Sequence, residues 1–171
     1  LRHSSAASDV YKRQVLKMPN NLNCETAMSY GTAGITAAAC VKKIVDAGCS
    51  KSLPVLVSGA TGGVGSVAVG ILSKIGYEVH AITGKPQENE ILMKMGAKTI
   101  IDRNEFLQDP IKPMDKALYS SAVDTVGGDI LAKTLTMVSN HGVVSCWGNV
   151  AGASFTSSVF PCILRGIQLC G

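Results

Sequence analysis

The sequence lacks any long apolar run, although it is rich in apolar residues. Of its 171 residues 46% are hydrophobic and 16% are charged, proportions typical of a globular domain. A membrane-spanning helix needs about 18 or more consecutive apolar residues, and no stretch of the sequence approaches that length. A secretory signal is also missing. We therefore expect a soluble, cytoplasmic chain with no membrane partner.

Metal-ligand spacing is the second absence. The six cysteines form no C-x-x-C pair, and the three histidines show no spacing typical of metal ligands. In a chain without a secretory signal, cysteines are expected to be reduced thiols. The sequence therefore predicts free cysteines and no metal site.

Positive charge is scarce and scattered. The formal net charge is +4, and Arg2, Lys12 and Arg13 in the first 14 residues contribute part of it. A nucleic-acid interface needs a basic patch or stripe, so this distribution excludes nucleic acid as an expected partner. Residues 1–14 are polar, have no periodicity and resemble translated adapter or vector sequence. We interpret them as a non-native or disordered tail and leave them out of the fold prediction.

Short β-rich runs alternate with helical patterns through the rest of the chain. The runs fall at 55–58, 77–83, 98–102, 121–126, 142–147 and 166–171. Apolar residues at helical spacing follow the first run, a second helix is expected between Pro86 and Gly96, and an additional helix over about 36–47. This alternation of strands and helices predicts right-handed crossovers and a doubly wound parallel α/β sheet of about six strands. We expect residues 15–50 to form a lead-in segment and helix, and residues 51–171 the sheet domain.

The first run leads into a glycine-rich turn, residues 59–65 of VLVSGATGGVG, which we call the glycine turn. A P-loop would need a lysine after its last glycine, but Ser66 follows Gly65. A Rossmann dinucleotide turn needs one glycine where the backbone approaches a pyrophosphate and another where the helix packs on the strand. Gly62 and Gly65 fit those places. A helix beginning near Gly63 would present N–H groups to the pyrophosphate, so the turn predicts a dinucleotide site; the alternative is a turn that serves packing only.

The end of the second strand indicates which dinucleotide binds. Enzymes that use NAD place a carboxylate about 20 residues after the turn, where it accepts hydrogen bonds from the ribose 2′-OH. Thr83, Gly84 and Lys85 stand there instead. Since a lysine is a suitable phosphate partner, the sequence predicts NADP(H). The alternative is that Lys85 is an ordinary solvated lysine ahead of a helix.

The glycine spacing also approximates that of short-chain dehydrogenases. Those enzymes carry a catalytic tyrosine with a lysine four residues later. Val15, Gly34, Ala81 and Val123 occupy the fourth position after the four tyrosines. The short-chain alternative is therefore the weaker one.

From Lys17 to Gly171 the sequence resembles the nucleotide-binding domain of zinc-independent medium-chain dehydrogenase/reductases, in the branch of quinone oxidoreductases and acrylyl-CoA reductases. The stretches that carry the resemblance are LKMPNNLNCETAMSYGTAGITAAACV, VSGATGGVGSVAV, TGK, ILMKMGAKTIIDRNEF, AVDTVGG, WGNVAG and FPCILRGIQLCG. In this family a threonine lies near the nicotinamide, and Thr36 is its match here; zinc-dependent relatives place a ligand cysteine about four residues before that threonine. Thr32 stands at the ligand position, so the resemblance also implies no metal.

The resemblance implies a set of cofactor-binding residues for NADPH. Near the nicotinamide it implies Thr36, with Thr32 as the second choice, and the strand ends at Thr125, Gly148 and Asn149. The diphosphate residues it implies are Thr61, Gly62, Gly63 and Val64, and the 2′-phosphate residues are Thr83, Gly84 and Lys85. Asp124 is interpreted as a structural carboxylate at a strand end rather than an acid catalyst.

The resemblance implies hydride transfer from NADPH to an α,β-unsaturated acyl-CoA such as acrylyl-CoA, or to an enone or a quinone. The family's substrate cleft lies between this domain and a GroES-like barrel that is lacking here, so we expect a fragment that is inactive alone. No catalytic residue is assigned. The alternative is a catalytically silent, crystallin-like NADPH-binding protein. A homodimer of the longer parent is a further expectation from the family.

Overall fold

The computed structural model describes residues 17–171, and the prediction of a non-native or disordered tail at 1–14 lies outside them. Six strands form one parallel sheet in the order β3-β2-β1-β4-β5-β6. The strands are β1 (Val55–Val57), β2 (Val79–Thr83), β3 (Thr99–Asp102), β4 (Ser121–Asp124), β5 (Val143–Cys146) and β6 (Gln168–Cys170). This is the strand order of a doubly wound Rossmann sheet, which confirms the predicted fold class.

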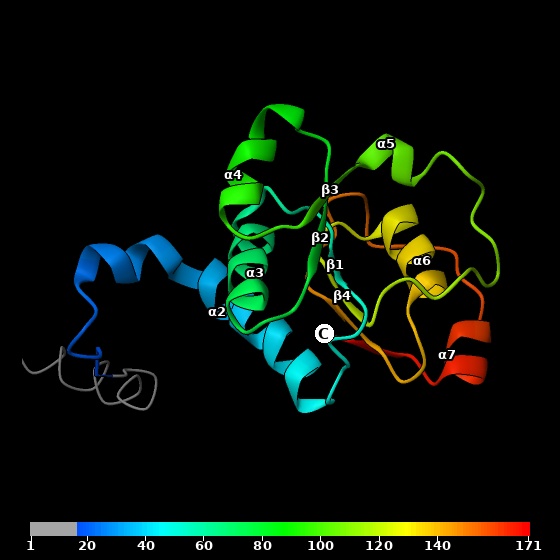
Figure 1. Ribbon diagram of the computed structural model, residues 1–171, viewed down its shortest axis with the longest axis horizontal. Coiled ribbons are helices and arrows are strands. Elements are labelled where there is room, and N and C mark those ends of the chain that lie inside the picture. The colour runs from blue at the N-terminus through cyan, green and yellow to red at the C-terminus, as the bar shows by residue number, and fades with distance from the viewer. Residues whose placement is uncertain (1–16) are drawn as a thin grey trace, which may run out of the picture. The chain divides into compact units, whose positions relative to one another are not determined.

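Helices cover both faces of this sheet (Figure 1). The elements on one side are α2 from Thr32 onward, α3 (Gly63–Lys74), η2 (Pro86–Glu88) and α4 (Asn89–Lys94); those on the other are α5 (Arg103–Phe106), α6 (Gly128–Met137) and α7 (Phe160–Arg165). The central strand β1 has no solvent exposure at any of its three residues. A strand covered on both faces can be apolar throughout, which explains why its sequence does not alternate.

The side chains of β1 divide between two apolar cores. Val55 and Val57 pack with Val69 and Leu72 of α3 on one face. Leu56 points to the other face, into a cluster that includes residues of α5 and α6. Because successive side chains of a strand point to opposite faces, one three-residue strand anchors both layers.

The long helix α2 (Cys24–Asp46) begins earlier than the predicted range of 36–47, so that boundary is wrong. Asn23 caps its start, since the Thr26 N–H donates to Asn23 Oδ1 at 2.8 Å. Gly31 interrupts the helix with φ 47° and ψ −148°, and the glycines here weaken the periodic pattern on which the prediction depended. The chain divides into two compact units at this point, and Thr32–Gly171 forms the unit that contains the sheet.

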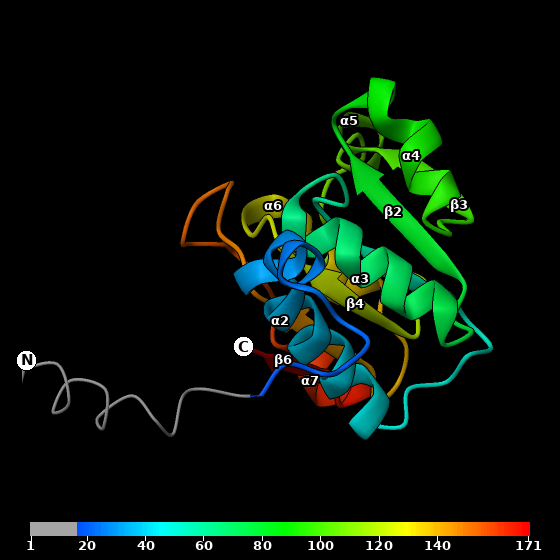
Figure 2. The same cartoon turned by 90° about the vertical axis from the view of Figure 1, so that its left-hand side faces the viewer.

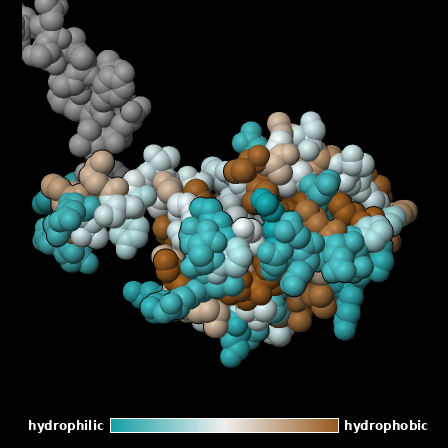
Figure 3. Space-filling view, turned by 90° about the horizontal axis from the view of Figure 1, so that it is seen from above, coloured by the Kyte–Doolittle hydropathy of each residue, from teal (hydrophilic) through white to brown (hydrophobic). Residues whose placement is uncertain are grey.

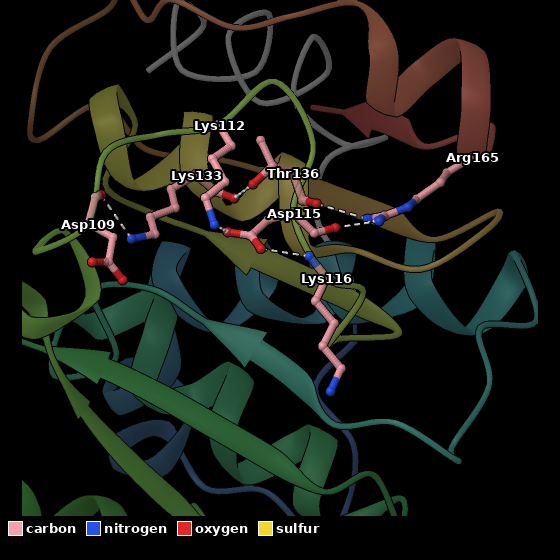
Figure 4. A network of polar contacts seen from close by, with 7 residues as sticks. All are labelled: Asp109, Lys112, Asp115, Lys116, Lys133, Thr136 and Arg165. Carbon is pink, nitrogen blue, oxygen red and sulfur yellow. Dashed lines mark hydrogen bonds and ion pairs between the residues drawn. The ribbon is translucent and has the colours of Figure 1, made fainter.

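Two cationic side chains bind the backbone of the long connection between α5 and β4, residues 107–120 (Figure 4). The Arg165 guanidinium donates to the carbonyl oxygens of Thr136 at 2.8 Å and Val138 at 2.9 Å, and also to that of Asp115. Lys133, which is 6% exposed, donates from Nζ to the carbonyl oxygen of Asp109 at 3.1 Å. The connection is therefore held to α6 and α7 through backbone carbonyls.

Apolar and polar side chains are interspersed on the surface seen from above Figure 1, as Figure 3 shows. Exposed apolar residues include Ile91 and Met93 of α4 and Met95 directly after it. From residue 17 to 171, none of the helices combines the length and the apolarity that a membrane crossing requires.

Candidate functional site

The glycine turn leaves the carboxyl end of β1 and leads directly into α3, which begins at Gly63 as predicted. Gly59 has φ +59°, and a β-carbon on it would lie 2.2 Å from Thr125 Oγ1. A β-carbon on Gly65 would lie 2.3 Å from the carbonyl oxygen of Gly59. Both positions therefore admit only glycine, and Gly65 is the point at which the helix packs against the strand end.

The start of α3 is suited to a negatively charged group. Its cap residue is Gly62, so no capping side chain occupies the N–H groups of the helix end. The first turn contains no acidic residue. The first N–H groups of a helix have no partner within the helix, and the aligned peptide dipoles add partial positive charge there. This end of α3 can therefore accept the oxygens of a phosphate.

A cavity of about 400 Å³ opens beside the turn, at the edge where the parallel strands end; in Figure 2 the arrow of β2 points toward this edge. It is lined by Gly59, Thr61, Gly62, Ile82, Thr83, Gly84, Lys85, Arg103, Thr125, Val126, Ile130 and Val150. This lining contains two cations and no carboxylate. Such a cavity suits an anionic ligand with apolar parts.

The two cations come from neighbouring strand ends. Lys85 follows β2, is 57% exposed, and lies 3.3 Å from Glu88 Oε1, an exposed ion pair of small energetic weight. Arg103 follows β3, and a β-carbon on Gly84 would lie 3.1 Å from Arg103 Cζ. The guanidinium therefore lies against the Thr83–Lys85 turn, close enough that a side chain at position 84 would have to displace it slightly.

Two threonines, Thr61 and Thr83, connect the glycine turn with the turn that contains Lys85. Thr83 Oγ1 accepts the Lys85 N–H at 3.0 Å, which fixes the backbone before the lysine. The hydroxyls of Thr61 and Thr83 lie 3.4 Å apart. The two loops that begin at β1 and β2 therefore meet through these side chains.

The structure brings together six of the eleven residues predicted to bind the cofactor. Those that line the cavity are Thr61, Gly62, Thr83, Gly84, Lys85 and Thr125. Gly63 and Val64 belong to the first turn of α3. Gly148 abuts Thr125, since a β-carbon on it would lie 2.0 Å from the Thr125 carbonyl oxygen.

Thr36 and Asn149 are not part of that lining. Thr36 lies within α2, where its hydroxyl donates to the carbonyl oxygen of Thr32 at 2.9 Å. Asn149 is exposed after β5, and its carbonyl oxygen accepts the Gly152 N–H at 2.9 Å. Their role in binding a cofactor stays a prediction.

Sequence reasoning missed Arg103. The signal that could have found it is the charged pair Asp102–Arg103, in which Asp102 ends the strand and Arg103 follows it directly. Because parallel strands end at the same edge of a sheet, a basic residue at the end of β3 must lie near the end of β2. Asp102 caps α5 by accepting the Asn104 N–H at 2.7 Å, which fixes where Arg103 leaves the backbone.

Metal-ligating side chains do not gather within the described part of the chain. From residue 17 onward, no three His, Cys, Asp or Glu side chains are placed to hold one ion. The predicted absence of zinc therefore stays a prediction for experiment.

Comparisons with known proteins identify the class to which this fold and cavity belong. The profile of the family described as "Zinc-binding dehydrogenase" matches residues 63–171. The chain belongs to this family. The predicted resemblance to its acrylyl-CoA reductase and quinone oxidoreductase branch is confirmed by the relatives below.

The chain is 38% identical over 168 residues to the acrylyl-CoA reductase AcuI of Ruegeria pomeroyi, covering 98% of this chain and 51% of that protein. Among solved structures, the yhdH oxidoreductase from Salmonella enterica in complex with NADP superposes with a TM-score of 0.87 at 40% identity. The Bacillus subtilis protein yhfP with NAD bound gives a TM-score of 0.87 at 41% identity. Each alignment with a structure covers 91% of this chain and 48% of the other chain. The chain thus spans about half the length of the relatives it matches.

Proposed function

We propose that this chain is the nucleotide-binding part of an NADPH-dependent oxidoreductase that reduces an α,β-unsaturated acyl-CoA such as acrylyl-CoA, or an enone or quinone. The observation that carries the proposal is the cavity beside the glycine turn. It pairs a helix start suited to a diphosphate with two cations and no carboxylate.

The residues present fit NADPH. The glycine turn gives the close backbone approach that a pyrophosphate needs, and α3 supplies N–H donors. Lys85 and Arg103 stand where the 2′-phosphate is expected, at the ends of β2 and β3. Guanidinium and ammonium groups form charge-assisted hydrogen bonds with phosphate, whereas a carboxylate at this position would repel it. These features favour NADPH over NADH.

The wider activity is proposed from the relatives. One of them is named an acrylyl-CoA reductase. When bound, NADPH would supply the hydride, and the role of this chain's residues is to hold and orient it. The strand ends at Thr125 and Gly148–Asn149 are proposed to face the nicotinamide half. Substrate-contacting groups are proposed to lie in the GroES-like barrel that the family resemblance implies for a longer parent, and the homodimer is a proposal of the same kind.

Cofactor preference tests the proposal on the chain as it stands. Lys85→Ala removes a charge-assisted contact, which should weaken NADPH by about 10- to 100-fold and leave NADH nearly unchanged. Arg103→Ala should act in the same direction. Lys94→Ala is the matched control, because Lys94 also pairs with a nearby glutamate, at 2.7 Å, on an exposed helix. Titration of both cofactors by fluorescence measures the effect, and equal losses for NADPH and NADH would contradict it.

Turnover separates the reductase from a silent NADPH-binding protein. Residues 32–171 can replace the matching residues of the Ruegeria pomeroyi reductase, which restores the length that this chain does not span. NADPH absorbance is then followed with acrylyl-CoA and with a quinone. A chimera that binds NADPH but oxidises it with neither acceptor would favour the silent alternative.

A further inference from the structure

Asp124 is a fully buried carboxylate at the carboxyl end of β4, with 0% solvent exposure. The ion pairs formed within residues 17–171 do not include it. A buried carboxylate is costly unless donors surround it. The hydrogen-bond partners of Asp124 therefore indicate its role in the structure.

Three donors meet the Asp124 carboxylate. Ser58 Oγ donates to Oδ1 at 2.6 Å, the Gly127 N–H donates to Oδ2 at 2.8 Å, and Cys146 Sγ lies 3.6 Å from Oδ2 as a third donor. Burial, and after it the charge of Asp124, raises the pKa of Cys146, so this side chain stays a protonated thiol. All three partners can donate, so donors meet both oxygens of the Asp124 side chain.

The three donors come from different parts of the chain. Ser58 follows β1, Gly127 precedes α6, and Cys146 is the last residue of β5. Ser58 is held a second time, because its Oγ accepts the Thr125 N–H at 3.1 Å. Thr125 Oγ1 in turn donates to the Ser58 carbonyl oxygen at 2.9 Å. One carboxylate thus joins the ends of β1, β4 and β5.

The residues next to these contacts form the cavity wall. Gly59 follows Ser58, and Thr125 and Val126 follow Asp124; all three line the cavity. The fit between the loops is close, since a β-carbon on Gly127 would lie 3.0 Å from the Gly152 carbonyl oxygen. The carboxylate is thus bonded to residues that directly adjoin two parts of the cavity wall.

We propose that Asp124 is a positioning residue for the dinucleotide: with Ser58 it fixes the glycine turn and the loop before α6 in the arrangement that binds the diphosphate. We call Asp124, Ser58 and Thr125 the strand-end clasp. The proposal rests on the proposed function, because it assigns the clasp to the NADPH site. Asp124 itself is fully buried and does not line the cavity, so it acts on the dinucleotide through the backbone of its neighbours.

Asparagine is the informative replacement because it keeps the size of the side chain. Its amide offers one acceptor and one pair of donors. If the NH₂ group faces Gly127, two N–H groups oppose each other. If it faces Ser58, the hydroxyl loses its acceptor. Either orientation costs one contact, so Asp124→Asn loosens the clasp without opening a cavity.

The experiment compares Asp124→Asn and Ser58→Ala with Ser121→Ala. Ser121 is the matched control, since it is a buried serine at the other end of β4 whose hydroxyl makes no hydrogen bond within the described structure. Trp147 is the only tryptophan in the chain and follows Cys146, so NADPH binding can be followed by its fluorescence. Amide hydrogen exchange without cofactor reports on Thr125 and Gly127 directly.

Both clasp variants should weaken NADPH by about 10-fold relative to Ser121→Ala. Exchange should accelerate at the Gly127 amide in Asp124→Asn and at the Thr125 amide in Ser58→Ala, while amides of residues 99–106 keep their rates. Affinities within about twofold of the control would overturn the positioning role. If Asp124→Asn does not fold, Ser58→Ala decides by the same criteria. A wild-type chain that fails to bind NADPH would refute the proposed function, and the exchange rates alone would then decide the clasp.

Discussion

Two alanine substitutions in the same helix are expected to have opposite effects on stability. In Gly65→Ala the new β-carbon would lie 2.3 Å from the Gly59 carbonyl oxygen and 2.9 Å from Ala60 Cα, both backbone atoms. The helix or the turn must therefore move by about 1 Å to reach an ordinary contact of 3.4 Å. In Gly70→Ala the β-carbon meets nothing within 4 Å.

The magnitudes follow from two opposing terms. Replacing a glycine inside a helix by alanine stabilises by about 0.5 to 1 kcal/mol, and this term applies to both variants. Overpacking at Gly65 costs about 1 to 3 kcal/mol. We expect Gly70→Ala to be more stable than the wild type by about 0.5 to 1 kcal/mol. Gly65→Ala should be less stable than the wild type by up to about 2.5 kcal/mol.

Urea unfolding followed by circular dichroism measures both variants. The difference between them isolates the steric cost, because the helix term cancels; unchanged slopes against urea would show that the unfolded state is the same. Displacement of the turn should also weaken NADPH in Gly65→Ala alone. A Gly65→Ala chain as stable as Gly70→Ala would refute the close approach of α3 to the turn.

Three further outcomes are expected. Burial raises the pKa of Tyr119, Cys40 and Cys146, so these groups stay protonated in the folded chain when their unfolded counterparts ionise near pH 9.0 to 10.0. Their contribution to the free energy of unfolding should therefore be constant below about pH 8 and be lost as the pH rises through 9 to 10, less steeply in Tyr119→Phe, as urea titrations at several pH values in this range would show. Arg165→Ala should cost about 2 kcal/mol or more, because three carbonyls lose a charged donor, and exchange should accelerate in residues 108–118; unchanged exchange there would contradict this. Elemental analysis of purified chain should find well under one zinc per chain, and stoichiometric zinc would refute the absence predicted from cysteine spacing and from Thr32.

The fold could be predicted because its signals are local. Each strand is a short apolar run, and alternation with helices restricts the sheet to a parallel arrangement. The start of α2 could not be predicted in the same way. There the Asn23 cap sets where the helix begins and Gly31 sets where it kinks, and the apolar periodicity shows neither.

The site was predictable where it lies on one continuous stretch. The glycine turn and Thr83–Lys85 each belong to a single strand–loop–helix step, so their spacing carries the information. Arg103 comes from the next strand and Asp124 acts through Ser58, which is 66 residues away in the sequence. Contacts of that kind depend on which strands are neighbours, and a sequence pattern does not state this.

The pairing of β1 with β4 also bears on how the chain folds during synthesis. β1 can pair with its second neighbour only after the ribosome has synthesised β4 (Ser121–Asp124). The glycine turn, in contrast, is complete once residue 65 has been added. At about 5 to 20 residues per second, the 66 residues from Ser58 to Asp124 take about 3 to 13 seconds to add. During that interval one edge of β1 lacks its partner strand, and the Gly59 conformation lacks the Thr125 contact. A nascent chain stalled before residue 121 should therefore be open to proteolysis at the glycine turn, and one stalled well beyond residue 146 should be protected.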